Sequence, residues 1–290
     1  MGLRLKFNMV LLVVFIIGLG ATGYISYELL HRNARDEVVR NAGVMMEAAL
    51  SMRGYTVGKV RPLLPYDPDK FLPESVPAFA ATEIIGLLRK KYPDYSYKEA
   101  ALNPTNPRNR AVEWETDILN TFRAGAGGAE ITGVRDTPTG RSLYLARPMS
   151  IRDQACLSCH TTPEQAPPAM VKLYGSSNGY GWKLNEVIAA QIVTVPMDLA
   201  IRNANRAFVT FMGSLVAVFA VLFVILNVML TLLIVEPITH LAHTADYISK
   251  GRLDAPDFAN TGKDEVSQLG QAFNRMRRSL EKAIALIDKA

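Results

Sequence analysis

The sequence predicts an α+β protein that is anchored in a membrane by two helices. Two long stretches, residues 7–27 and 207–235, contain no charged residue. Between them lies a domain-sized segment in which helical and strand-like patterns occupy separate runs, which is typical of the α+β class. We therefore expect a first membrane helix in residues 1–30, an external domain in 31–206, a second membrane helix in 207–235 and a helical tail in 236–290.

The two uncharged stretches are long enough to cross a bilayer, because about 20 apolar residues span the hydrocarbon core as a helix. The first stretch follows Arg4 and Lys6, and a cleaved signal peptide has the same basic-then-apolar order. We favour an uncleaved anchor, because the apolar run is longer than a signal core and a second span follows. The alternative for the second stretch is the buried core helix of a soluble protein.

The orientation follows from the positive-inside rule, which places Arg4 and Lys6 in the cytoplasm. Two spans then return the C-terminus to the cytoplasm and leave the segment between them outside. His31, Arg32 and Arg35 oppose this orientation weakly.

Composition argues against two classes of function. The net charge is +5 and the pI is about 9.1, but much of the positive charge flanks the apolar spans, which suits a membrane surface. No basic stripe with interleaved aromatic residues is present, so we expect no nucleic-acid partner. We interpret Glu83, Glu113, Glu115 and Asp117 as solvated helix faces and expect no enzyme activity.

The external segment contains three helical and three strand-like patterns. Proline residues separate the first two helices, and a turn at 136–140 separates the first two strands. Ile84, Leu87 and Leu88 are expected on one face of the second helix. The expected helices are Asp36–Lys59, Val76–Lys91 and Trp114–Phe122, and the expected strands are Glu130–Val134, Ser142–Arg147 and Ala189–Val195.

The chemistry-bearing motif is Cys156-Leu157-Ser158-Cys159-His160, which contains both cysteines of the chain. Cys-x-x-Cys-His is the attachment signature of c-type haem. Two thiols add to the two vinyl groups of the porphyrin, and the adjacent histidine binds the iron. We therefore expect one covalently attached haem c, with thioethers from Cys156 and Cys159 and proximal ligation by His160. Such attachment occurs outside the bacterial cytoplasmic membrane, so the motif favours a periplasmic domain on an inner-membrane protein.

Two other interpretations of the motif compete with haem attachment. A thioredoxin-like redox pair requires the motif after a strand and at a helix start in a βαβ unit, whereas this motif lies between Arg147-Pro148 and Thr162-Pro163 in loop-rich sequence. A zinc site requires two more Cys or His ligands, and the external segment offers only His31.

The sixth iron ligand remains open. His240 and His243 lie in the tail, so bis-histidine ligation is not expected, and methionine is the remaining common choice. We prefer Met46 or Met52, because a long helix can lay a side chain over a haem face. The other candidates are Met45, Met149, Met170 and Met197, and an open site for a gas ligand is the alternative.

Four arginines could pair with the haem propionates, because guanidinium groups bind carboxylates bidentately. They are Arg53, Arg108, Arg110 and Arg147, and a solvated surface role is the alternative for each.

The tail has apolar residues at alternating spacings of three and four, which is a heptad seam. Glu236-Pro237-Ile238 follows the second span, and Gly251-Arg252-Leu253 breaks the first tail helix. Together with Asp264-Glu265 at the start of a second helix, these features resemble a HAMP domain, a parallel four-helix bundle in a dimer. A lone coiled coil is the alternative. The seam residues are Ile238, Leu241, Ala245, Ile248, Val266, Leu269, Phe273, Met276, Leu280, Ala283 and Ile287.

The external segment resembles a bacterial family of extracytoplasmic c-type haem domains with a PAS-like fold, over roughly residues 35–200. The resemblance rests on residues 95–97, 102–107, 144–148, 156–160 and 180–182. It implies a short antiparallel sheet flanked by helices, with haem in a pocket against the sheet, and sensing of redox state or small ligands. Some relatives use a cysteine as distal ligand, which this chain, with no third cysteine, cannot supply.

The order of haem domain, membrane span and HAMP module predicts a homodimeric sensor of a redox or gas signal. No output domain follows the tail before Ala290, so we expect either a separate cytoplasmic output protein or a truncated chain. The alternatives are a membrane-tethered mono-haem cytochrome for electron transfer and a remnant receptor with a scaffolding role.

Overall fold

The computed structural model describes residues 2–64, 70–252, 257–258, 262 and 264–287. It divides into two compact units, which we describe separately. One is Tyr27–Ala207, and the other combines Met1–Ser26 with Phe208–Ala290.

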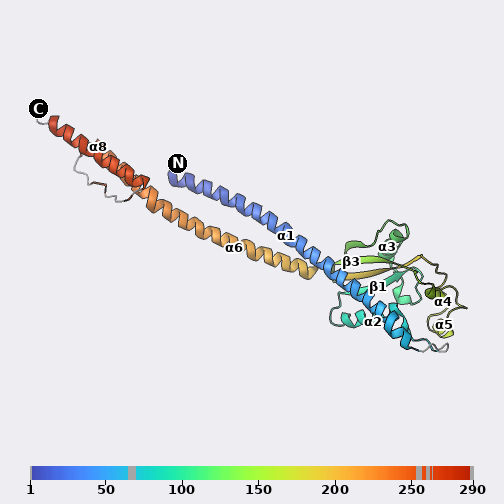
Figure 1. Ribbon diagram of the computed structural model, residues 1–290. Helices are drawn as coiled ribbons and strands as arrows, with labels where there is room; N and C mark the ends of the chain where they lie inside the picture. The colour runs from blue at the N-terminus through green and yellow to red at the C-terminus, as the bar shows by residue number, and fades with distance from the viewer. Residues whose placement is uncertain (1, 65–69, 253–256, 259–261, 263, 288–290) are drawn as a thin grey trace. The chain divides into compact units, whose positions relative to one another are not determined.

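The unit Tyr27–Ala207 is built on a four-stranded antiparallel sheet with the strand order β1-β4-β3-β2 (Figure 1). Residue Thr137 pairs with Gly140 where β2 and β3 form a hairpin, and Gly140 has a φ of 118°, which a residue without Cβ adopts most readily. This confirms the expected turn at 136–140. The strands are β1 (Ser96–Ala101), β2 (Ile131–Thr137), β3 (Gly140–Ser150) and β4 (Val187–Pro196).

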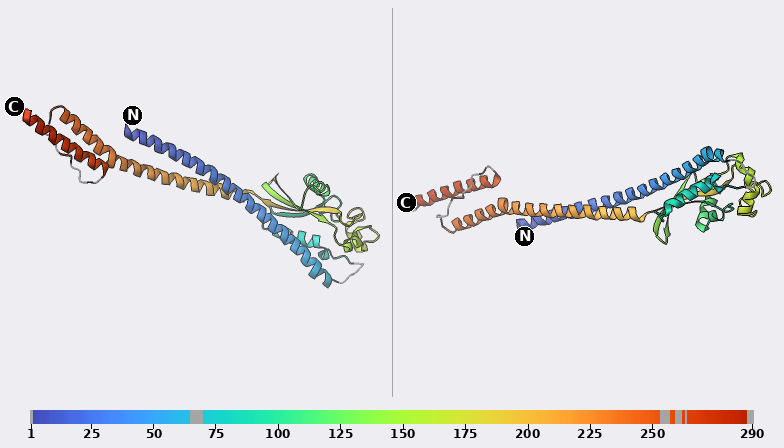
Figure 2. Two further views of the ribbon diagram at one scale, coloured as in Figure 1. Left: turned by 45° about the horizontal axis from the view of Figure 1, so that its top comes forward. Right: turned by 90° about the horizontal axis from the view of Figure 1, so that it is seen from below.

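The two faces of the sheet pack against different helices (Figure 2). Leu145 and Val193 lie in a core with Met46 of α1 (Leu3–Tyr55), and α2 (Pro77–Arg89) packs on the same face. Their neighbours Ala146 and Ile192 lie in a second core with α3 (Glu113–Arg123). This division follows from strand geometry, because successive side chains point to opposite faces.

Shorter elements connect these parts. After α1 the chain makes one π-helical turn, Thr56–Val60, before the 3₁₀ turns Arg61–Leu63 and Pro73–Ser75. Further 3₁₀ turns are Pro107–Asn109 and Gln154–Cys156, and the short helices are α4 (Leu157–His160) and α5 (Pro168–Tyr174).

The three helices and three strands expected in the external segment are present, with β1 as an additional strand. The expected face of α2 was wrong. Ala81 and Ile85 are its buried residues, whereas Ile84, Leu87 and Leu88 are 44%, 62% and 42% exposed. This helix has apolar residues on more of its surface than the one face that the sheet and α1 cover.

The second unit contains the two apolar helical segments. α1 and α6 (Asp198–Leu230) are each long and apolar enough to cross a membrane. Within this unit they contact each other, since the rings of Phe15 and Phe219 stack with centroids 4.7 Å apart. A second π-helical turn, Thr231–Val235, joins α6 to the tail.

The tail forms α7 (Glu236–Ser249) and α8 (Glu265–Ile287), which lie side by side (Figure 2). Leu241 and Ile248 of the expected seam are buried, whereas Leu269, Met276 and Leu280 are 54%, 62% and 44% exposed in the single chain. Leu253 of the expected helix break and the side chain of Ile287 lie outside the described residues. Three of the described seam residues of α8, Leu269, Met276 and Leu280, are therefore left exposed by one copy of the chain.

Candidate functional site

The motif Cys156–His160 forms a short helical stretch that follows β3. Asp153 begins it, because its carboxylate accepts a hydrogen bond from the backbone N–H of Ala155 at 2.9 Å. In a helix, residues three and four positions apart share one face. Cys156, Cys159 and His160 have this spacing, and all three line one cavity.

The His160 ring is held in a defined orientation. Its Nδ1 lies 2.7 Å from the carbonyl oxygen of Gly179, and a carbonyl can only accept, so Nδ1 carries the proton. The ring also stacks on Trp182, with centroids 3.9 Å apart and planes 14° apart. Burial lowers the pKa of His160, and the bond to Gly179 opposes this in part. Nε2 is therefore the unprotonated nitrogen that can bind a metal, and the Nδ1 bond is the usual support of a metal-binding histidine.

Asn103 fixes the loop that carries Gly179. Its Nδ2 donates to the carbonyl of Tyr180 at 2.9 Å, and its Oδ1 accepts from the N–H of Gly179 at 2.8 Å. Gly179 has a φ of 86°, and a Cβ there would lie 2.1 Å from Oγ1 of Thr105. The loop therefore approaches the segment after β1 as closely as a glycine permits.

The cavity encloses about 430 Å³ between the sheet, the end of α1, the start of α2 and the motif. Ala101 and Ala189 form part of its floor and are almost fully buried, and these small side chains leave room for a flat group against the sheet. Cys156 and Cys159 are free thiols and half-buried. Burial and the carboxylate of Asp153 raise the pKa of Cys156, against the opposing effect of two arginines.

The comparisons with known proteins identify this unit. A family model described as Tll0287-like matches residues 31–196, over half of the chain. The chain belongs to the Tll0287-like family. A HAMP domain model matches residues 229–282, so the chain joins a Tll0287-like domain to a HAMP domain, as the sequence features predicted.

One solved structure is similar, the crystal structure of the cyanobacterial heme-protein Tll0287. It is 15% identical, the match covers 55% of this chain and 95% of that chain, and the TM-score is 0.43. No curated protein matches the chain significantly.

The Tll0287-like domain brings only two of the four expected arginines to the cavity, Arg53 and Arg108. Arg110 instead donates to Oδ1 of Asn178 at 2.8 Å. Arg147 lies 2.6 Å from Glu47 and 3.2 Å from Glu130. Arg110 and Arg147 do not line the cavity, whereas Arg53 and Arg108 line it and form ion pairs with Glu99 and Glu83.

The preferred methionines do not line the cavity either. Met46 is fully buried between α1 and the sheet, and Met52 packs against the same core. Two of the other candidates, Met149 and Met170, do line it. The helical stripe that contains Met46 is used for core packing along the sheet, and only its end, at Arg53, reaches the cavity.

Sequence reasoning missed a buried polar cluster beside the cavity, two members of which, Arg53 and Glu99, line the cavity. Arg53 of α1 forms an ion pair with Glu99 of β1, which is 2% exposed. Tyr97 donates to Oε1 of Glu99 at 2.7 Å, and Nε2 of Gln191 donates to the Tyr97 hydroxyl at 3.0 Å. Burial and the Glu99 carboxylate raise the pKa of Tyr97. The available signal was the order Tyr97-Lys98-Glu99, in which the residues at alternate positions share a strand face.

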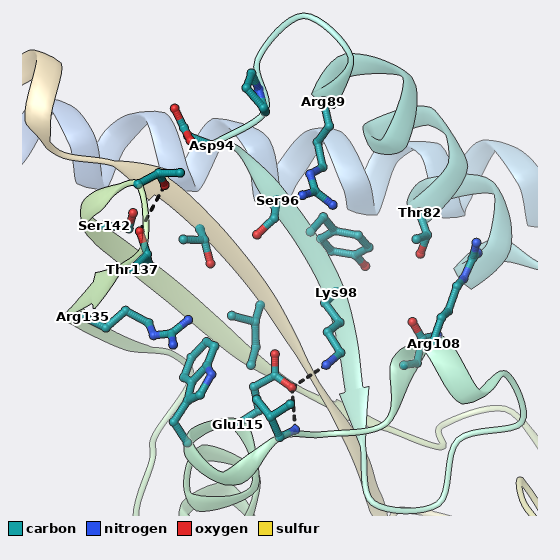
Figure 3. A pocket seen from close by; sticks show the side chains of 18 residues that line it. Thr82, Arg89, Asp94, Ser96, Lys98, Arg108, Glu115, Arg135, Thr137 and Ser142 are labelled. Carbon is teal, nitrogen blue, oxygen red and sulfur yellow. Dashed lines mark hydrogen bonds and ion pairs between the residues drawn. The ribbon is translucent and has the colours of Figure 1, made fainter.

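A second cavity, of about 690 Å³, lies along β1 and extends onto the α3 face of the sheet (Figure 3). Lys98 and Glu115 point toward each other there, with Nζ and Oε2 2.6 Å apart (Figure 3). Arg135 lies over the Trp114 ring, 4.1 Å from its centroid. The residues that line this second cavity include neither cysteine nor histidine.

Proposed function

We propose that this chain is a membrane-bound sensor that carries one covalently attached c-type haem. One observation carries the proposal. Cys156, Cys159 and His160 line a single cavity of a Tll0287-like domain, in a chain that also has a HAMP domain.

The residues of the cavity suit this group. Cys156 and Cys159 would form the thioethers, and Nε2 of His160 would bind the iron while Nδ1 stays on Gly179. Arg53 and Arg108 supply cations for the propionates. The cavity volume of about 430 Å³ falls in the usual range for cofactor sites. Haem supplies one-electron redox chemistry and, where a coordination position is open, binding of small ligands.

The sixth ligand of the haem iron would come either from a residue that lines the cavity or from a small external molecule. Met149 and Met170 line the cavity, whereas the sequence-preferred Met46 and Met52 lie in the core of the domain. We therefore propose either of the first two methionines, or a small ligand such as a gas, in this position.

We further propose that α1 and α6 cross a bacterial inner membrane. Arg4 and Lys6 favour a cytoplasmic N-terminus. Two spans then place the Tll0287-like domain in the periplasm, where haem attachment occurs, and the HAMP domain in the cytoplasm. HAMP domains are dimeric signalling modules, and the exposed seam of α8 fits a second copy of this chain. We propose that the HAMP domain passes the signal to a downstream output.

The test measures whether the state of the haem changes the HAMP domain. The full chain, matured with the haem-attachment machinery, carries Met276→Cys on the α8 seam and is placed in lipid nanodiscs. A short bis-maleimide then cross-links the two copies in the ferric, ferrous and carbon monoxide-treated ferrous states. Arg275→Cys, an exposed neighbour off the seam, is the matched control.

A sensor should show a cross-linking rate at residue 276 that differs between states, with little change at residue 275. Equal rates at residue 276 in all three states would contradict sensing. They would instead favour the tethered electron carrier.

A further inference from the structure

The buried cluster beside the cavity contains one full ion pair, between Arg53 and Glu99. Glu99 is 2% exposed and Arg53 is 23% exposed by side chain. Tyr97 and Gln191 complete the cluster and are 6% and 5% exposed. Gln191 donates to the Tyr97 hydroxyl, and Tyr97 and Arg53 both donate to Oε1 of Glu99.

Fold stability is a weak explanation for such a pair. Removing two charges from water is costly, and apolar replacements of buried ion pairs are often neutral or stabilising. The pair also lines a cavity that contains other chemically reactive groups, the two thiols and the imidazole. The pair therefore points to a task at the cavity.

The position of the pair suggests that task. Both Arg53 and Glu99 line the cavity that contains Cys156 and His160. Arg53 also belongs to α1, the helix that begins at Leu3 and contains the first apolar segment. The π-helical turn Thr56–Val60 follows directly and contributes Val57 to the lining. Such turns interrupt regular helices frequently at functional sites.

We propose that Arg53 and Glu99 are positioning residues that set the reduction potential of the cavity-bound cofactor and report its charge to α1. This inference rests on the proposed haem function. A fixed negative charge at Glu99 disfavours the addition of an electron nearby, and the positive charge at Arg53 compensates for it. When the charge in the cavity changes, the balance of forces on Arg53 changes, and Arg53 is the member of the pair that lies on α1.

The electrostatic sign gives a sharp test in the full-length chain with attached haem. Glu99→Gln leaves Arg53 without its carboxylate, so the midpoint potential should rise. The expected increase in the equilibrium constant for reduction is about tenfold, as for one unit charge at short range in a partly buried site. The double variant Arg53→Gln/Glu99→Gln removes both charges and should return toward wild type. Arg53→Lys keeps the positive charge and should stay near wild type.

The chain offers a matched control for the ion pair. Arg147 and Glu47 also join the sheet to α1, at 2.6 Å, but neither residue lines the cavity. Arg147→Gln should therefore leave the midpoint potential unchanged.

The second readout is hydrogen–deuterium exchange of residues 46–60 in the oxidised and reduced states. The wild type and Arg147→Gln should show a difference between states at Thr56–Val60. Glu99→Gln and the double variant should lose it, which a purely structural role of the pair would not predict.

Two failures are distinguishable. A wild-type chain that retains no haem would contradict the proposed function itself. A haem-loaded Glu99→Gln variant with the wild-type potential, or one that keeps the exchange difference, would overturn the role of the pair and leave the haem assignment intact.

Discussion

The two cavities of the Tll0287-like domain differ in chemistry more than in size. The cavity beside α3 is larger, about 690 Å³ against 430 Å³, but its central charges already satisfy each other through Lys98 and Glu115 (Figure 3). The smaller cavity holds two free thiols and an oriented imidazole above a floor of small side chains. The candidate functional site is therefore identified by the chemical groups that line a cavity and not by the volume of the cavity.

The strongest difference between the two cavities should be spectral. His160→Ala should leave the haem attached through both cysteines but remove the proximal nitrogen, so the absorption spectrum of the ferrous protein should change. Lys98→Met alters only the larger cavity and should keep the wild-type spectrum. A His160→Ala variant with the wild-type ferrous spectrum would show that the imidazole is not an iron ligand.

The next comparison is between two variants that place a bulky side chain in one cavity or in the other. Ala189→Phe fills the floor of the smaller cavity, and overpacking costs about 1–3 kcal/mol. Since the phenylalanine ring would occupy the space for a flat group against the sheet, the ratio of haem absorbance to protein should fall well below that of the wild type. Thr194→Phe in the larger cavity should retain the wild-type ratio. Equal losses in the two variants would mean that folding, and not haem access, limits loading.

The support of His160 gives an intermediate effect. Asn103→Ala removes both hydrogen bonds to the loop of Gly179, which should lower the free energy of unfolding by about 1–3 kcal/mol. Thermal unfolding followed by haem absorbance and by far-ultraviolet circular dichroism measures it. Asn178→Ala, on the same loop but paired with the exposed Arg110, should change stability by less than about 0.5 kcal/mol. Equal losses of stability in the two variants would show that Asn103 does not fix the loop of Gly179.

The weakest effect should come from the larger cavity. Glu115→Gln weakens the pair with Lys98 and the hydrogen bond from the N–H of Val112, 2.9 Å long. Denaturant unfolding should show a loss of about 1 kcal/mol, with an unchanged haem spectrum. A shifted spectrum in this variant would contradict the assignment of the haem to the smaller cavity.

The motif could be found from sequence because its geometry is local. Cys156, Cys159 and His160 lie within one helical stretch, so their spacing alone places them on one face. The hairpin of β2 and β3 and the helices α1 and α3 follow equally local rules of turn chemistry and periodicity.

The rest depends on partners that are distant in sequence. β1 was missed because Lys98 and Glu99 are adjacent charged residues, which argues against a strand until Glu115 and Arg53 are seen to neutralise them. Arg147 was expected at the cavity, but Glu47, one hundred positions earlier, holds it elsewhere. Met46 was expected over a haem face, but the packing of α1 on the sheet buries it in the core.

Covalent haem attachment can be tested by the intact mass of the denatured full chain after expression with the haem-attachment machinery. We expect the mass of the wild type to increase by one haem. We expect no increase in the Cys156→Ser/Cys159→Ser variant. A wild-type chain of unmodified mass would contradict haem attachment at Cys156 and Cys159, and with it the proposed sensor.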